Sequence, residues 1–267
     1  MGGLWQSVRA ENGHIALPLV ALLAVAMAAP TAEASHGGVL VPPGRGSALA
    51  YFQWTAKNVL GDCSGVLIAQ RAVLTAAHCV RSTQFGRHRV AEVRIGNPRG
   101  RTVRVPVQRV RPHPHFDPSH PERGNDLAIL VLARGAGRAG LGIVGSTTEP
   151  SQGSRIEVLG FGVTAAGQRP NAARRPRVVE LEVLSPFNCA GGNVEAFDAT
   201  RWCAASPRAA TCAGDSGGPA VMRLAGGREV IVGLVSFAVE QVSCRTAVSV
   251  LTRVAAFRPW IRASVKP

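Results

Sequence analysis

The chain has 267 residues, of which 46% are hydrophobic and 5% aromatic, and its formal net charge is +14. This length can bury a substantial core as one large or two small domains, and the lack of a heptad pattern or internal repeat excludes a coiled coil or a repeat protein.

Nearly all of the positive charge is arginine, because Lys57 and Lys266 are the only lysines. Two interpretations stay open: attraction to polyanions or acidic cell surfaces, or a compositional bias without a partner. No nucleic-acid-binding motif is present, so we expect no specific nucleic-acid role.

The N-terminal segment has the features of a secretory signal peptide. An apolar run at 15–29 follows a short polar start, and Ala32-Glu33-Ala34 fits the small-residue preference of signal peptidase. The run is short for a membrane span, and no second apolar run of spanning length follows. We therefore expect residues 1–34 to be removed on secretion, 35–38 to form a short propeptide, and 39–267 to form an extracellular domain without a membrane span.

Short apolar segments, separated by glycine and proline, form two series along the rest of the chain. Their length, alternation and punctuation are typical of strands in antiparallel barrels. The expected strands of the first series are 50–55, 63–69, 72–75, 90–95, 102–110 and 126–132, and those of the second are 154–160, 178–184, 219–224, 229–237 and 247–252. Residues 134–145 link the series, 162–177 read as an exposed loop open to nicking, and helical spacing of apolar residues follows from Val254.

Histidines occur in two different settings in the first series. His78 ends an apolar run and stands beside a cysteine, in Leu74-Thr75-Ala76-Ala77-His78-Cys79. The run from Arg111 to Phe116 contains His113 and His115, with His120 nearby, and this invites a metal-site hypothesis. For this segment we favour a loop over a metal site. A zinc site is disfavoured as well, because the chain has no Cys-x-x-Cys pair.

A serine candidate nucleophile lies in the stretch Thr211-Cys212-Ala213-Gly214-Asp215-Ser216-Gly217-Gly218-Pro219. A serine hydroxyl is a poor nucleophile at neutral pH, so Ser216 needs a general base nearby and donors for the oxyanion that its attack creates. The flanking glycines allow a sharp turn in which the amides of Gly214 and Ser216 converge on one point. Further upstream, Asp126 opens an apolar run in Asn125-Asp126-Leu127-Ala128-Ile129-Leu130.

These three motifs, in the order His, Asp, Ser, resemble the trypsin/chymotrypsin-like serine endopeptidases, whose motifs read TAAHC, DIAL-like and GDSGGP. The resemblance covers roughly residues 39–265. It implies an all-β fold of two antiparallel six-stranded β-barrels, at about 48–134 and 146–252, with a C-terminal helix at about 254–265. It also implies that His78 is the general base, that Asp126 orients it, and that Ser216 is the nucleophile, with the amides of Gly214 and Ser216 holding the oxyanion.

The six cysteines fit an oxidising compartment, and they allow fifteen pairings. The resemblance selects Cys63 with Cys79, Cys189 with Cys203, and Cys212 with Cys244, which leaves no free thiol. The family's calcium-binding loop should follow His78, but Glu92 is the only acidic residue between Arg81 and Arg104. Calcium needs several oxygen ligands, so we expect no metal and no cofactor.

The resemblance also places the residues that bind substrate. Ala210 stands where trypsin-type enzymes carry the aspartate that selects arginine or lysine. Ser236 and Phe237 match the segment that pairs with the substrate backbone, although Phe237 replaces the usual tryptophan. Ala238 and Ser249 replace pocket glycines, so their side chains shorten the pocket. We expect small or medium apolar residues at P1, the position before the cleaved bond.

Activation is where the chain departs most from the family, whose zymogens are cut after a basic residue to release an Ile-Val-Gly-Gly terminus. Asp215 is present to pair with the new ammonium, but the nearest candidate terminus, Val39, has neither a basic residue before it nor Gly-Gly after it. Two hypotheses follow. We favour a secreted, monomeric serine endopeptidase that acts on proteins or peptides, because the three motifs are intact. The alternative is a secreted, non-catalytic binding protein on the same fold, held in a zymogen-like state.

Overall fold

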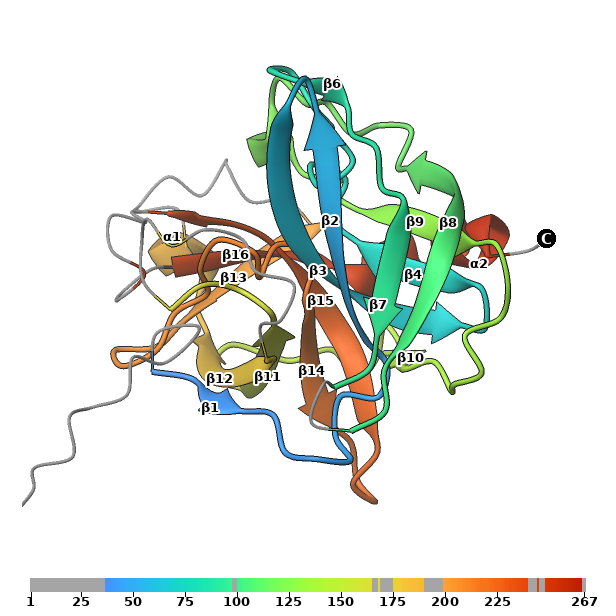
Figure 1. The fold of residues 1–267 in the computed structure, drawn as a ribbon. Helices are drawn as coiled ribbons and strands as arrows, with labels where there is room; N and C mark the ends of the chain where they lie inside the picture. The colour runs from blue at the N-terminus through green and yellow to red at the C-terminus, as the bar shows by residue number, and fades with distance from the viewer. Residues whose placement is uncertain are drawn as a thin grey trace, which may run out of the picture. The chain divides into compact units, whose positions relative to one another are not determined.

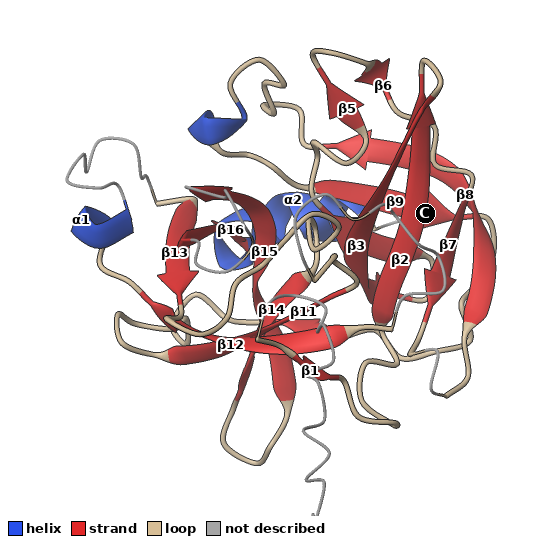
Figure 2. Cartoon of the chain, turned by 60° about the vertical axis from the view of Figure 1, so that its left-hand side comes forward, coloured by secondary structure: helices blue, strands red, loops and turns tan. Residues whose placement is uncertain are grey.

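The computed structural model describes residues 37–97, 100–164, 168, 175–189, 199–239, 244 and 248–265. The predicted signal peptide lies outside these residues, as does most of the loop predicted at 162–177. Strands dominate the described chain and helices are short (Figures 1 and 2). No helix among the described residues is long and apolar enough to cross a membrane.

The first barrel closes through six antiparallel strands in the order β2-β3-β4-β9-β8-β7. Its strands are β2 (Leu49–Ala56), β3 (Val59–Ala69), β4 (Ala72–Thr75), β7 (Glu92–Ile95), β8 (Val103–Pro112) and β9 (Ala128–Leu132). The β2–β3 hairpin turns at Lys57 and Asn58, whose φ angles of 45° and 68° suit the two-residue turn that matches strand twist. Phe52, Leu74 and Leu130 are fully buried in its core. A small hairpin of β5 (Arg81–Ser82) and β6 (Gly86–Arg87) follows β4.

The second barrel is a ring in the order β12-β11-β14-β15-β16-β13, which the pairing of β12 with β13 closes. Its strands are β11 (Arg155–Gly160), β12 (Arg177–Val183), β13 (Arg201–Ala205), β14 (Pro219–Arg223), β15 (Glu229–Val239) and β16 (Val248–Arg253). Two short strands extend it: β1 (Val39–Leu40) pairs with β12, and β10 (Gly142–Ile143) runs parallel to β15. The predicted all-β fold of two six-stranded barrels is therefore confirmed, although β13 was absent from the predicted strands.

The chain ends in a 3-10 turn, η3 (Val254–Phe257), followed by α2 (Arg258–Ser264). Pro259 lies in the first turn of α2, where its missing N–H costs no helical hydrogen bond. The guanidinium of Arg111 on β8 donates to the carbonyl oxygen of Ser264 at 2.7 Å, so the helix that follows the second barrel ends against the first. The other helical segments are η1 (Pro121–Arg123) and α1 (Pro186–Cys189).

Candidate active site

His78 and Asp126 meet at the rim of the first barrel. His78 follows the buried strand β4 through two alanines that are 0% exposed, and Asp126 lies two residues before the start of β9. Asn125 positions Asp126 by taking a φ of 56°, a conformation that asparagine tolerates well. Two hydrogen bonds join the pair: the backbone N–H of His78 donates to Oδ1 of Asp126 at 2.9 Å, and Nδ1 of His78 lies 2.7 Å from Oδ2. The imidazole is thus fixed at Nδ1, and its Nε2 faces away from the carboxylate.

The second barrel also holds Asp126. Ser236 on β15 donates its hydroxyl to Oδ2 of Asp126 at 2.5 Å, and Thr252 on β16 donates to the carbonyl oxygen of Asp126 at 3.1 Å. Asp126 is 1% exposed, so its carboxylate is almost wholly surrounded by protein. The orientation of His78 therefore depends on both barrels.

The electrostatics of the pair favour a charged complex. Burial disfavours the imidazolium form of His78, but the charge and hydrogen bond of Asp126 outweigh burial and raise the pKa of His78 above 6.5. Burial likewise opposes ionisation of Asp126, but the charge of His78 and hydrogen bonds from His78 and Ser236 bring the pKa of Asp126 below 3.8. Asp126 therefore stays ionised at neutral pH and stabilises a proton on His78.

Ser216 lies in a tight turn that contacts between the barrels hold in place. Gly214 and Gly217 have φ angles of 92° and 76°, which only glycine adopts readily. A Cβ at Gly217 would lie 2.1 Å from Oγ1 of Thr75 on β4, so no larger residue fits there. Ser64 on β3 binds the turn twice: its N–H donates to the carbonyl oxygen of Ser216 at 2.9 Å and its hydroxyl to that of Gly214 at 2.7 Å.

The turn presents two unused backbone donors. The amides of Asp215, Gly217 and Gly218 donate to the carbonyl oxygens of Cys212, Val235 and Asp215, respectively. Within the described part of the chain, the amides of Gly214 and Ser216 have no such acceptor. Two amides two residues apart in one turn can bind a single negatively charged oxygen, as the sequence predicts for an oxyanion hole.

The Cys63–Cys79 disulfide brings the histidine and the serine together. Sγ of Cys79 lies 3.8 Å from Nε2 of His78 and 3.8 Å from the carbonyl oxygen of Ser216. Among the described contacts no hydrogen bond joins Oγ of Ser216 to the imidazole; such bonds are often long before substrate binds. Both sulfurs near His78 are in the disulfide, so this cluster offers no thiolate to a metal.

The carboxylate of Asp215 is buried in a space that glycines leave open. Asp215 is 1% exposed, and its carboxylate accepts the amide of Gly162 at 2.8 Å and the amide of Cys212 at 2.9 Å. A Cβ at Gly160 or Gly162 would lie 2.1 Å or 2.4 Å from the nearest carboxylate atom. These two glycines therefore allow the carboxylate to lie beneath the serine turn.

Two of the predicted substrate-binding residues are fully buried, and the other three lie on β15. Ala210 and Ser249 are 0% exposed, and Ser249 shares a 2.8 Å hydroxyl–hydroxyl bond with Thr211. Ala238 lies opposite Ser249 on the paired strands β15 and β16, and Phe237 packs against buried residues of the second barrel. Ser236 lies at an irregularity in the same pairing, and its side chain contacts Asp126.

All three disulfides that the resemblance implied are present: Cys63–Cys79, Cys189–Cys203 and Cys212–Cys244, with no free cysteine among the described residues. The last of these ties the serine turn to the segment before β16. In the histidine-rich run, the backbone N–H of His113 donates to the carbonyl oxygen of Leu127, next to Asp126, at 2.9 Å. His113 packs its ring against Phe257 and Trp260, and His120 lies 3.0 Å from Glu122.

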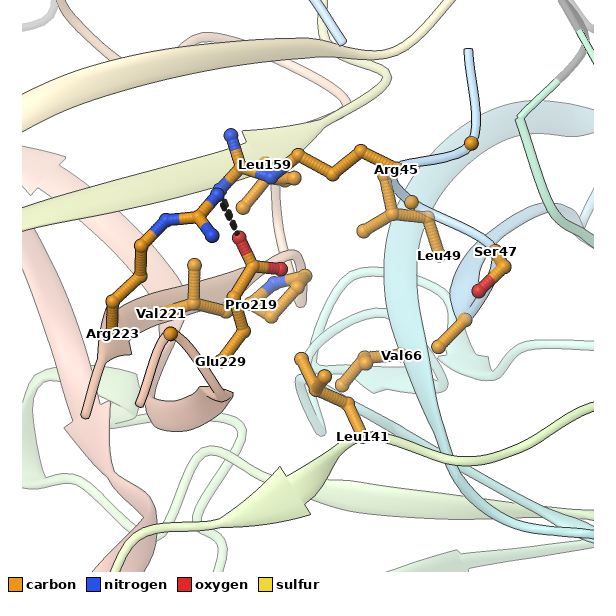
Figure 3. Close-up of a pocket in the computed structure, with 14 residues that line it drawn as sticks. Arg45, Ser47, Leu49, Val66, Leu141, Leu159, Pro219, Val221, Arg223 and Glu229 are labelled. Carbon is orange, nitrogen blue, oxygen red and sulfur yellow. Dashed lines mark ion pairs between the residues drawn. The ribbon is translucent and has the colours of Figure 1, made fainter. Parts of the chain in front are cut away.

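A separate cavity of about 460 Å³ lies where the loop before β2 meets β3, β11, β14 and β15 (Figure 3). Its walls combine apolar side chains, among them Leu49, Leu159 and Val221, with the ion-paired Arg45, Arg223 and Glu229. No residue of the His78–Asp126–Ser216 set lines it. We therefore do not assign the catalytic chemistry to this cavity.

The roles of several residues that support the site were not predicted from the sequence. Ser64, Thr252 and Gly162 each make a hydrogen bond that holds the serine turn or a carboxylate. Ser64 stands next to Cys63, but serine after cysteine has no distinctive local pattern. Their roles depend on contacts across 53 to 150 positions of sequence, which local patterns do not reveal.

Comparison with known proteins agrees with this geometry. The family model described as Trypsin matches residues 41–261. Duodenase-1 of Bos taurus is 30% identical over 257 residues, covering 92% of this chain and 95% of its own, and Granzyme-like protein 1 of Rattus norvegicus is 31% identical over 263 residues, covering 93% and 98%. A solved structure described as "Structure of GrC" is 28% identical, with a TM-score of 0.72 over 86% of this chain and 99% of its own.

Proposed function

We propose that this chain, which belongs to the trypsin family of serine proteases, is an active secreted endopeptidase that acts through an acyl-enzyme on Ser216. The observation that carries the proposal is the combination of a doubly hydrogen-bonded His78–Asp126 pair with two unused amides in the turn of the serine. A chain that only bound partners would need neither feature. The six cysteines in disulfides support an oxidising, extracellular destination.

In the proposed mechanism, Ser216, His78, Asp126 and the two amides act first in forming the acyl-enzyme and again in its hydrolysis. Nε2 of His78 takes the hydroxyl proton as Oγ of Ser216 bonds to the substrate carbonyl carbon, and the amides of Gly214 and Ser216 bind the oxyanion. Each such donor contributes about 2.7–4 kcal/mol in enzymes of this type. The tetrahedral intermediate then expels the amine, which receives the proton from His78. Water repeats the sequence on the acyl-enzyme and frees Ser216, while Asp126 stabilises the imidazolium in both halves.

We propose small or medium apolar P1 residues as the preferred substrates. Ala210 offers no charge to a basic side chain. The buried carboxylates of the described residues are Asp126 and Asp215, and both already bind other groups. A buried arginine or lysine side chain would lack a counter-ion, which is costly. The hydroxyls of Thr211 and Ser249 bond to each other, which supports a neutral, shortened pocket.

We further propose that residues 1–34 are a signal peptide and that the mature, monomeric chain keeps residues 35–38, which the sequence alone suggested were a short propeptide. A Cβ on Gly37 would lie 1.9 Å from the carbonyl oxygen of Arg208, and Arg177 donates to the carbonyl oxygen of Gly38 at 2.7 Å. Cleavage before Val39 would remove these contacts. In a chain that begins at Ser35, by contrast, the two glycines occupy the third and fourth positions, as Gly-Gly does in Ile-Val-Gly-Gly.

Profiling on a peptide library tests this function. Purified secreted protein should cleave after alanine, valine or leucine, Ser216→Ala should show no cleavage, and Ser47→Ala, at an exposed serine, should match wild type. Cleavage after arginine or lysine would overturn the specificity. No cleavage by folded, processed wild type would overturn the enzyme and favour a non-catalytic binding protein.

A further inference from the structure

A group of arginines surrounds a hollow on the first barrel, where β8 meets the turn between β3 and β4 and the end of α2. The hollow has a volume of about 530 Å³. Arg71, Arg109 and Arg111 line it, together with Gln70 and Gln108. Its remaining lining is apolar except for Ser264. We call this surface the arginine hollow; in Figure 1 its strand β8 lies beside α2.

No acidic residue belongs to the arginine hollow or to the segments that build it. The sequence has no aspartate or glutamate at 63–91, 93–116, 127–148 or 241–267. These ranges contain the β3–β4 turn, most of β7, β8, β9 and all of α2. On the neighbouring strand β7, Glu92 lies opposite Pro106 of β8, but its carboxylate is already paired with Arg104.

The charges of the three arginines are not neutralised by the described protein. Arg71 donates to the carbonyl oxygen of Leu132 and to the amide oxygen of Gln108, and Arg111 donates to the carbonyl oxygen of Ser264. The side chain of Arg109 is exposed and makes no hydrogen bond or ion pair within the described residues. Other arginines of the chain do find carboxylates, as Arg45–Glu157 and Arg253–Glu149 show.

Hydrogen bonds connect a residue of the hollow, Gln70, to further arginines outside it. Gln70 donates to the carbonyl oxygen of Arg138 at 2.9 Å, and Arg138 in turn donates to the carbonyl oxygen of Arg101. Arg134 donates to the carbonyl oxygen of Arg104 at 2.8 Å. Guanidinium groups bind sulfate, phosphate and carboxylate through paired hydrogen bonds, so a row of them suits a polymer with repeated anionic groups.

We propose that the arginine hollow binds an extracellular anionic polysaccharide. The apolar part of the lining, which includes Ala69, Ala72 and Val131, suits the C–H face of a sugar ring, while the arginines receive its anionic groups. The lining has no aromatic side chain for bases to stack on, which disfavours single-stranded nucleic acid. The proposal does not rest on peptidase activity, because no catalytic residue lines the hollow.

Binding of fluorescent heparin to the Ser216→Ala protein, titrated at several salt concentrations, tests the proposal without autolysis. We compare a hollow variant, with Arg71, Arg109 and Arg111 changed to glutamine, with a control variant in which the exposed Arg87, Arg175 and Arg228 are changed likewise. The two variants have the same net charge. At about fivefold per arginine, the hollow variant should bind roughly 100-fold more weakly at physiological salt. Its slope of log affinity against log salt should decrease by about 2 to 3.

Equal loss of affinity in the two triple variants would overturn the proposal, because net charge alone would then explain binding. Tighter binding to duplex DNA than to heparin would overturn it in favour of a nucleic-acid partner. Circular dichroism checks the fold of each variant. If loss of the Arg111 bond unfolds the hollow variant, Arg109→Gln against Arg87→Gln decides, since Arg109 has no bond to lose: about fivefold weaker binding supports the proposal, and no difference overturns it.

Discussion

The buried hydroxyl of Ser236 allows a quantitative test of how the second barrel supports His78 and Asp126. It donates to Oδ2 of Asp126 at 2.5 Å, and Ser236 is 3% exposed. A hydrogen bond to a charged group contributes about 1.5–3 kcal/mol. We expect Ser236→Ala to lower the free energy of unfolding by that amount at neutral pH, with Tm falling by about 2–4 °C for each kcal/mol in a chain of this size.

The same substitution should preserve most of the activity. Loss of this hydrogen bond to the ionised form raises the pKa of Asp126 towards its usual value. Because that pKa starts below 3.8, the carboxylate stays ionised at neutral pH and still orients His78. We expect kcat/KM to fall by about tenfold or less. Asp126→Asn, which removes the charge, should lower kcat by about 10⁴-fold, as it does in related proteases.

The pH dependence of stability gives a second readout of the Ser236 hydroxyl. A carboxylate with a depressed pKa stabilises the fold above its unfolded pKa, and this stabilisation is lost as pH falls through the folded value. The difference between wild type and Ser236→Ala should therefore be full above about pH 5 and shrink below about pH 4. Thr252→Val is the matched control, because it removes a bond to the backbone carbonyl of Asp126, and its cost should not vary over this range.

Urea unfolding across this pH range and kcat/KM on a chromogenic peptide measure both effects. A Ser236→Ala protein within about 0.5 kcal/mol of wild type at neutral pH would show that this hydroxyl does not stabilise the fold. A loss of kcat as large as that of Asp126→Asn would show that Asp126 cannot orient His78 without the Ser236 hydroxyl. If the stability losses of Ser236→Ala and Thr252→Val depended equally on pH, the Ser236 hydroxyl would not specifically stabilise the ionised form of Asp126.

Three further substitutions or measurements probe separate parts of the site. Ala210→Asp should raise kcat/KM for arginine relative to alanine at P1 by at least about tenfold, and an unchanged ratio would show that residue 210 does not face the pocket. Gly162→Ala should cost about 1–3 kcal/mol and most of the activity, because its Cβ meets Asp215, whereas Gly142→Ala, with open space around its Cβ, should do neither. N-terminal sequencing of the secreted protein should begin at Ser35, and a start at Val39 would contradict the role given to the two glycines.

The barrels could be predicted from sequence because their strands carry local signals. Alternating apolar residues and glycine or proline punctuation marked eleven segments that correspond to strands of the two barrels. β13 escaped because Arg201-Trp202-Cys203-Ala204-Ala205 is short and lacks alternation, and it becomes a strand by pairing with β12 and β16. Pairing partners distant in sequence therefore decided this strand, and its own residues did not.

The candidate site likewise combines residues that local sequence reveals with residues that only the fold reveals. His78, Asp126 and Ser216 stand in motifs that a single sequence reveals, whereas the hydroxyls of Ser64 and Thr252 act through contacts that only the folded chain creates. The arginine hollow shows the same limit. The composition showed an excess of arginine. Only the fold, which brings β8, the β3–β4 turn and α2 together, shows that three of these arginines line one hollow.

Labelling with a fluorophosphonate probe shows whether Ser216 is an activated nucleophile. The processed, secreted protein should label in stoichiometric amounts, and Ser216→Ala should not label. His78→Ala should label far more slowly, because the hydroxyl would lose its base. Labelling that persists in Ser216→Ala, or no labelling of folded and processed wild type, would contradict the account.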